Sequence, residues 1–198
     1  MLKFKSLILL AMLASVSVFS HAEDYLKSIK EFELKDQNGN MHSLDDYADK
    51  DYIVVYTHGS GCPIARLSVP EYVKLEKEYS QQNIEFLMLN SFIQDDIPRI
   101  KNEAEEFNIT FPILKDADQS VGRSLGAERT AEAFIIDPRT QEVLFRGPIN
   151  DGLGYETQRT VVENHYLKNA LDTIIAGGSV NMSDIPDAKG CLIGYFLS

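Results

Sequence analysis

The chain has 198 residues, of which 44% are hydrophobic and 25% charged, and a formal net charge of −11 at pH 7. This length suits one domain built around a single core. An acidic surface repels phosphate backbones, and the sequence has no basic stripe interleaved with aromatic residues, so we expect no nucleic-acid partner.

The first 22 residues have the pattern of a secretory signal peptide. Lys3 and Lys5 precede an apolar run from Leu7 to Phe19, and Ser20-His21-Ala22 places small residues at a cleavage site before Glu23. Loss of the two lysines takes the net charge from −11 to −13. The apolar run is short for a membrane span. We therefore expect a periplasmic or secreted protein with no integral membrane span after removal of the signal peptide, and an uncleaved anchor is the alternative.

The pattern downstream is mixed α/β and begins with a β-hairpin. Residues 31–35 and 41–44 resemble two short strands, and Asn38-Gly39 between them is a hairpin turn signal. Tyr52 to Thr57 is almost wholly apolar, as in a central strand covered on both faces. The later pattern predicts, in chain order, helix 64–82, strand 84–90, helix 97–107, a short segment at 111–114, helix 119–125, strands 132–137 and 142–146, and helix 161–176.

Cys62 follows the glycine loop Gly59-Ser60-Gly61, at the point where the central strand should lead into a helix. The unpaired N–H groups and positive dipole of a helix N-terminus stabilise a thiolate and lower the pKa of the thiol. Cys62 is therefore a candidate nucleophile or metal ligand. The alternative is a half-buried cysteine that acts as a small hydrophobic residue.

Cys62 and Cys191 are the two cysteines of the chain. In an oxidising compartment they can form one intramolecular disulfide. A structural disulfide, a redox pair and a shared metal site all remain open on the residues alone.

The order of elements and four short motifs resemble a known group of proteins. The motifs are Cys62-Pro63-Ile64-Ala65, His165-Tyr166-Leu167, Ala170-Leu171-Asp172 and Gly190-Cys191. With them, the chain resembles the thioredoxin-like redoxins of the alkyl hydroperoxide reductase/thiol-specific antioxidant superfamily, in a secreted bacterial branch. The resemblance implies a thioredoxin-like α/β fold, with a central mixed sheet flanked by helices and preceded by the hairpin. On this resemblance, together with the N-terminal pattern, we divide the chain into a signal peptide (1–22), a thioredoxin-like domain (23–178) and a C-terminal tail that carries Cys191 (179–198).

The chain departs from the better-known relatives at several positions. Ala65 stands where a thioredoxin has its second cysteine, so Cys62 has no neighbouring resolving thiol. Gly59 and Val55 stand where peroxiredoxins have threonine and proline. Ala131 stands where thioredoxin-like proteins carry a cis-proline opposite the active cysteine, and a cis bond without proline is costly.

The resemblance implies a thiol-dependent oxidoreductase of redoxin type in which Cys62 is the nucleophile and Cys191 the resolving thiol. Arg129, expected opposite Cys62, and Arg66 are candidates to stabilise a thiolate or a peroxide oxygen. His58 is a candidate base or hydrogen-bond partner. The substrate would be a thiol or disulfide protein, or a small peroxide.

Two alternatives belong to other functional classes. In the first, Cys62 and Cys191 bind Cu(I) together with His58 or His165, as a soft-metal delivery protein would. In the second, the chain is a non-catalytic thioredoxin-like binding module. The redox reading needs no cofactor, whereas the metal reading needs copper.

Overall fold

A computed structural model describes residues 28–153 and 161–196 of the chain. The predicted signal peptide lies outside these ranges, and the division of the chain at residues 22 and 178 stays a prediction. The strands are β1 (Glu33–Lys35), β2 (Met41–Ser43), β3 (Tyr52–His58), β4 (Ile84–Asn90), β5 (Ile113–Lys115), β6 (Glu132–Ile136) and β7 (Val143–Pro148). The helices are α1 (Pro63–Tyr79), α2 (Ile97–Phe107), α3 (Ser120–Leu125) and α4 (Tyr166–Ile175), with short 3-10 turns at Leu44–Tyr47 and Met182–Asp184.

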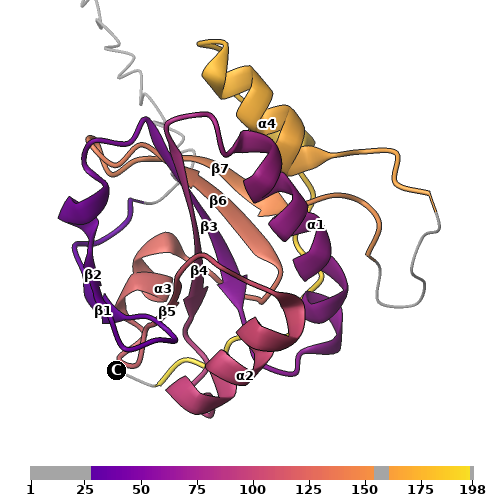
Figure 1. The fold of residues 1–198 in the computed structure, drawn as a ribbon. Coiled ribbons are helices and arrows are strands. Elements are labelled where there is room, and N and C mark those ends of the chain that lie inside the picture. The colour runs from indigo at the N-terminus through magenta and orange to yellow at the C-terminus, as the bar shows by residue number, and fades with distance from the viewer. Residues whose placement is uncertain (1–27, 154–160, 197–198) are drawn as a thin grey trace, which may run out of the picture.

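The seven strands form one mixed sheet in the order β2-β1-β5-β4-β3-β6-β7 (Figure 1). The central strand β3 pairs in parallel with β4 and antiparallel with β6. Six of its seven residues, 53–58, are buried, which accounts for the apolar run at its start. The predicted hairpin is confirmed, since β1 and β2 are antiparallel.

Each face of the sheet carries its own hydrophobic core. One core packs α1, α2 and α4 against the sheet, and the other packs α3 and the residues before β3 against the opposite face. In Figure 1, α1 and α4 lie side by side, and the hydroxyl of Tyr79 donates to Asp172 at 2.6 Å between them. These layers confirm the predicted thioredoxin-like α/β fold.

The last helix begins later than the sequence pattern predicts. We expected a helix from residue 161, but α4 begins at Tyr166 with His165 as its N-cap residue. The backbone before it is held by Asp151 instead, which accepts hydrogen bonds from Glu163 N at 3.0 Å and Asn164 Nδ2 at 2.9 Å. These bonds give the segment an alternative to helical pairing.

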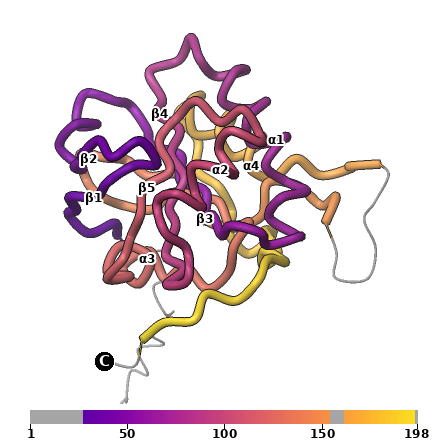
Figure 2. Tube along the Cα trace, turned by 60° about the horizontal axis from the view of Figure 1, so that its bottom comes forward, coloured from indigo at the N-terminus to yellow at the C-terminus, as the bar shows by residue number. Residues whose placement is uncertain are grey.

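The C-terminal tail packs along the domain as far as residue 196. In Figure 2 it is the yellow tube at the bottom of the view, below β3 and α3. Gln119 fixes its far end, donating to Gly194 O at 2.8 Å and accepting from Phe196 N at 2.9 Å. Within the two described ranges, none of the helices is long and apolar enough to cross a membrane.

Candidate active site

Cys62 lies at the junction between β3 and α1. It is the N-cap residue of α1, and Pro63 occupies the first helical position, where the missing N–H costs nothing. The carbonyl of Cys62 accepts the first helical hydrogen bond, from Arg66 N at 3.0 Å. The strand, the loop and the helix therefore place this sulfur as the sequence predicts.

Cys62 forms a disulfide with Cys191, and their Cα atoms lie 6.3 Å apart. The tail thereby covers the start of α1, and Cys62 is only 5% exposed. Cys62 is therefore shielded from solvent in the disulfide form. Cys191 is half-buried and is followed by Leu192, which is 64% exposed.

Thr130 connects both cysteines. Its Oγ1 lies 3.1 Å from the sulfur of Cys62 and accepts a hydrogen bond from Cys191 N at 2.9 Å. Its own N–H donates to the carbonyl of Cys191 at 2.9 Å. Because the hydroxyl accepts from Cys191, its proton can point at Cys62.

Gly190 allows the tail to approach this closely. A Cβ atom on Gly190 would lie 1.7 Å from the carbonyl oxygen of Thr130, a distance that no side chain tolerates. The short bridge between Arg129 and Leu192 continues the contact on the other side of Cys191. Gly190 is therefore required for the tail to pack here, and Cys191 supplies the second sulfur of the disulfide.

Ala131, at the position of the expected cis-proline, has a trans peptide and a φ of 61°. Its N–H donates to Thr57 O at 2.9 Å at the end of β3. A left-handed backbone conformation costs a non-glycine residue about 1–2 kcal/mol. The loop thus passes Cys62 without a cis peptide bond.

Two buried carboxylates hold the loop that precedes Cys62. Asp95 accepts from Ser60 N at 2.7 Å, and Glu103 on α2 accepts from Gly61 N at 2.8 Å. The N–H of Cys62 donates to Gly59 O at 3.1 Å. All three consecutive backbone donors before the helix are therefore occupied within the protein.

His58 lies beneath this loop and is completely buried. Its Nδ1 lies 3.0 Å from Asn90 Nδ2, and its Nε2 lies 3.5 Å from Glu103 Oε1, so both ring nitrogens are directed at residues other than the cysteines. Burial alone would raise the pKa of Glu103. The hydrogen bond and charge of His58, together with Gly61 N and Arg66, outweigh burial and lower that pKa below its ordinary value of 4.5.

The structure brings Arg129 near the tail and Arg66 near α2. Arg129 donates to Gly190 O at 3.3 Å. Arg66 pairs with Glu103 at 3.4 Å and with Glu106. Both arginines, which the sequence offered as partners for a thiolate or a peroxide, are therefore engaged by other acceptors.

The four residues of the copper alternative do not form one cluster in the disulfide form. His58 faces Asn90 and Glu103, and His165 caps α4. Among the residues that the structure describes, no group of three or more His, Cys, Asp or Glu side chains is arranged to hold a metal ion. Copper binding stays a prediction for the reduced protein.

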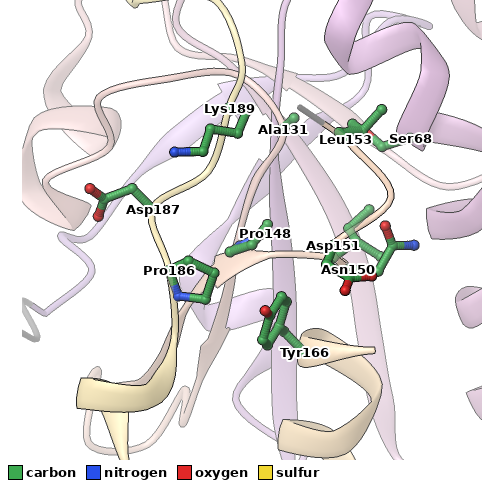
Figure 3. A pocket seen from close by; sticks show the side chains of 11 residues that line it. Ser68, Ala131, Pro148, Asn150, Asp151, Leu153, Tyr166, Pro186, Asp187 and Lys189 are labelled. Carbon is green, nitrogen blue, oxygen red and sulfur yellow. The ribbon is translucent and has the colours of Figure 1, made fainter. Parts of the chain in front are cut away.

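A pocket of about 360 Å³ lies between the tail and the domain, and neither cysteine lines it. Ala131, next to Thr130, forms part of its wall, and Lys189 brings the tail to it one residue before Gly190. Figure 3 shows Pro186 and Asp187 on the tail at the left of the view, Asn150 and Asp151 across from them at the right, and Tyr166 below. The pocket also contacts Ser68, Pro148, Ile149, Asn150, Asp151 and Leu153.

Sequence reasoning missed Thr130, Gly190, Asp95 and Glu103 as site residues. Thr130 stands immediately before Ala131, so the position of the expected cis-proline was the signal that could have found it. No local pattern marks Asp95 or Glu103, because each reaches the loop from another element.

A family model described as the AhpC/TSA family matches residues 26–143. The chain belongs to this family. The thiol-disulfide oxidoreductase ResA of Geobacillus thermodenitrificans is 26% identical over 144 residues, covering 69% of this chain and 81% of that protein. ResA of Geobacillus kaustophilus is 28% identical over 123 residues, covering 62% of this chain and 65% of that protein.

Solved structures share the fold of this chain. A hypothetical protein of Sinorhizobium meliloti superimposes with a TM-score of 0.76 at 26% identity, covering 87% of this chain and 96% of that one. Peroxidoxin BcpB of Mycobacterium tuberculosis, at 20% identity, has a TM-score of 0.53 over 67% of this chain and 86% of that one. The latter similarity shows the shared fold alone.

Proposed function

We propose that this chain is a thiol-disulfide oxidoreductase that works outside the cytoplasm and alternates between a dithiol and the Cys62–Cys191 disulfide. The observation that carries the proposal is the disulfide itself, because it joins the cysteine at a helix N-terminus to one on the tail. The predicted signal peptide and the ResA relatives support the same reading.

The chemistry consists of two exchange steps. The thiolate of Cys62 attacks one sulfur of a partner disulfide and expels the other as a thiolate, which leaves a mixed disulfide. The thiolate of Cys191 then attacks the sulfur of Cys62 and expels the partner's second thiolate. The partner gains two electrons and two protons as a dithiol, and this chain is left oxidised.

Contacts around the loop favour a disulfide over a hydroperoxide as the oxidant. When a thiolate attacks a peroxide, the O–O bond breaks, a sulfenic acid forms, and negative charge develops on the departing oxygen. Each donor aimed at such an oxygen is worth about 10²–10³ in rate. Here the N–H groups of Ser60, Gly61 and Cys62 already have internal acceptors, two of them carboxylates.

The first test asks whether oxidation joins the two cysteines. Reduced protein is treated with one equivalent of oxidised thioredoxin-type protein or of hydrogen peroxide, and the products are digested and analysed by mass spectrometry. We expect a Cys62–Cys191 linkage, and Cys191→Ser should retain a mixed disulfide or a sulfenic acid on Cys62. A Cys62→Ser control should form neither.

The second test compares oxidants. The rate constant of the reduced protein with oxidised glutathione is divided by its rate constant with hydrogen peroxide. The thiolate fraction cancels in this ratio. The ratio is then compared with the same ratio for free cysteine at the same pH. A site with one donor aimed at the departing oxygen would shift this normalised ratio toward peroxide by at least about 100-fold. We expect no such shift, so that the ratio for the protein stays close to that of free cysteine or favours the disulfide. A shift of about 100-fold toward peroxide would contradict the choice of oxidant.

A Cu(I) titration of the reduced protein separates the redox and metal readings. The soft-metal alternative would replace this proposal if one equivalent binds, if binding weakens in Cys62→Ser, in Cys191→Ser and in either His58→Ala or His165→Ala, and if oxidation does not link the cysteines.

A further inference from the structure

We infer that a partner's cysteine reaches Cys62 on an extended strand that takes the place of the C-terminal tail, and that the residue before this cysteine has to be glycine. The inference rests on the redox cycle proposed above and adds the class of partner segment that the site accepts. It follows from the way in which the tail is held, because the tail brings a cysteine to the same sulfur.

The tail lies along residues 128–130 as an added antiparallel strand. An antiparallel bridge joins the two segments. Thr130 N donates to Cys191 O at 2.9 Å, and Ile193 N donates to Glu128 O at 2.9 Å. Cys191 N donates to Thr130 Oγ1 at 2.9 Å. These bonds use only main-chain atoms of the tail, so an extended segment of another protein can make the same bonds by strand addition.

Reduction makes this edge available to a partner. Once the disulfide is broken, noncovalent contacts alone hold the tail there, and a partner strand can replace its hydrogen bonds one for one. The thiolate of Cys62 then attacks the sulfur of the strand's cysteine, the partner's S–S bond breaks, and the partner's other sulfur leaves as a thiolate. When the tail returns, the thiolate of Cys191 attacks the sulfur of Cys62 and expels the strand's cysteine as a thiolate.

The carbonyl of Thr130 selects the residue before the cysteine. A Cβ atom on Gly190 would lie 1.7 Å from this oxygen and 2.5 Å from Thr130 Oγ1. Glycine is the residue that lets two backbones approach this closely. The next residue of the loop holds it in place, because Ala131 N donates to Thr57 O at 2.9 Å. A partner strand with any other residue before its cysteine therefore loses the pairing.

The two positions after the cysteine are selected differently. Leu192 is 64% exposed, so the first of these positions faces solvent and is not selected. Ile193 is 7% exposed and belongs to the hydrophobic core on the α3 face of the sheet. Burial there favours partner strands with an apolar residue two positions after the cysteine. The expected partner segment is thus Gly-Cys-x-apolar, where x is any residue.

The experiment measures how fast reduced Cys191→Ser protein reacts with a set of peptides. The parent peptide copies residues 188–193, Ala-Lys-Gly-Cys-Leu-Ile, and three others carry alanine for the glycine, alanine for the leucine or serine for the isoleucine. Each cysteine is linked by a disulfide to nitrothiobenzoate, a good leaving group whose release is followed by absorbance. Each rate constant is divided by that of the same peptide with free cysteine, and mass spectrometry identifies the peptide on Cys62.

We expect the peptide with alanine for glycine to react at least about tenfold more slowly than the parent, because its methyl group overpacks against a fixed main chain. Loss of the isoleucine should slow the reaction at least about threefold. Loss of the exposed leucine should change the rate by less than about twofold. Equal rates for the glycine and alanine peptides overturn the inference and leave the redox cycle intact. If no peptide becomes bound to Cys62, the redox cycle itself fails and the inference fails with it.

Discussion

At the scale of single residues, Gly190 is the position on which the site depends most directly. Changing it to alanine puts a Cβ atom against the carbonyl of Thr130, so the tail must move away from the loop. We expect Gly190→Ala to lose most of the Cys62–Cys191 disulfide under air oxidation and to destabilise the protein by about 1–3 kcal/mol, as overpacking does. Alkylation of free thiols followed by mass spectrometry measures the first effect, and urea unfolding measures the second.

Gly194 provides the matched control for this change. It lies on the same tail, and a Cβ atom there meets nothing within 4 Å. Gly194→Ala should therefore keep the disulfide. Equal loss in both variants would mean that any added bulk on the tail prevents pairing, and the close contact at Thr130 would not be the reason.

Thr130 should matter in the reduced protein as well. Its hydroxyl lies within contact of the Cys62 sulfur and can donate to a thiolate there. In a Cys191→Ser background, we expect Thr130→Val to slow alkylation of Cys62 at pH 6 by roughly fivefold, which corresponds to one hydrogen bond of about 1 kcal/mol. Thr130→Ser keeps the hydroxyl and should react like the parent. If Cys62 in Thr130→Val were alkylated as fast as in the parent, Thr130 would not stabilise the thiolate.

At the scale of elements, α2 is coupled to the nucleophile loop through Glu103. The lowered pKa of Glu103 means that its ionised form is more stable in the folded protein than in the unfolded chain. Its contribution to folding is therefore complete above the ordinary pKa of 4.5 and is lost as the pH falls through the lower folded-state value.

This coupling can be measured by urea unfolding of oxidised wild-type protein and of Glu103→Gln between pH 3 and pH 7. We expect the wild type to be the more stable at pH 7, and the difference between the two proteins to shrink below about pH 4.5 because the wild-type carboxyl becomes protonated. Parallel profiles across this range would show that Glu103 contributes no pH-dependent stability.

Elements with strong local patterns were predictable from the sequence, and elements set by distant contacts were not. The apolar run of β3, the Asn-Gly hairpin and the Asp96-capped helix α2 all lie where their patterns place them. The start of α4 was predicted five residues early, because Asp151 captures the preceding backbone. The hydrogen bonds from the loop before Cys62 to Asp95 and Glu103 could not be predicted for the same reason, because these acceptors are 35 and 42 residues away in sequence.

At the scale of the whole molecule, the disulfide ties the tail to the core across 129 residues. Closing a loop of this length lowers the entropy of the unfolded chain and stabilises the folded state by about 5 kcal/mol in the loop-entropy estimate. We expect a reductant to lower the urea midpoint of wild-type protein markedly. The double variant Cys62→Ser/Cys191→Ser should unfold at the same midpoint with and without reductant.

A wild-type midpoint that does not respond to reductant would mean that the unfolded ensemble is compact enough to make the cross-link irrelevant. The disulfide to Cys191 would then contribute to the redox reaction and not to the stability of the fold.

The same separation of 129 residues has a consequence for how the protein is made. Ribosomes add about 5–20 residues per second, so Cys62 exists for on the order of ten seconds before Cys191 has been synthesised. Throughout that interval, a nascent chain that meets an oxidising compartment presents one cysteine without its native partner. Correct pairing must therefore wait for the end of synthesis, and any earlier bond that Cys62 makes has to be with another molecule and has to be reversible.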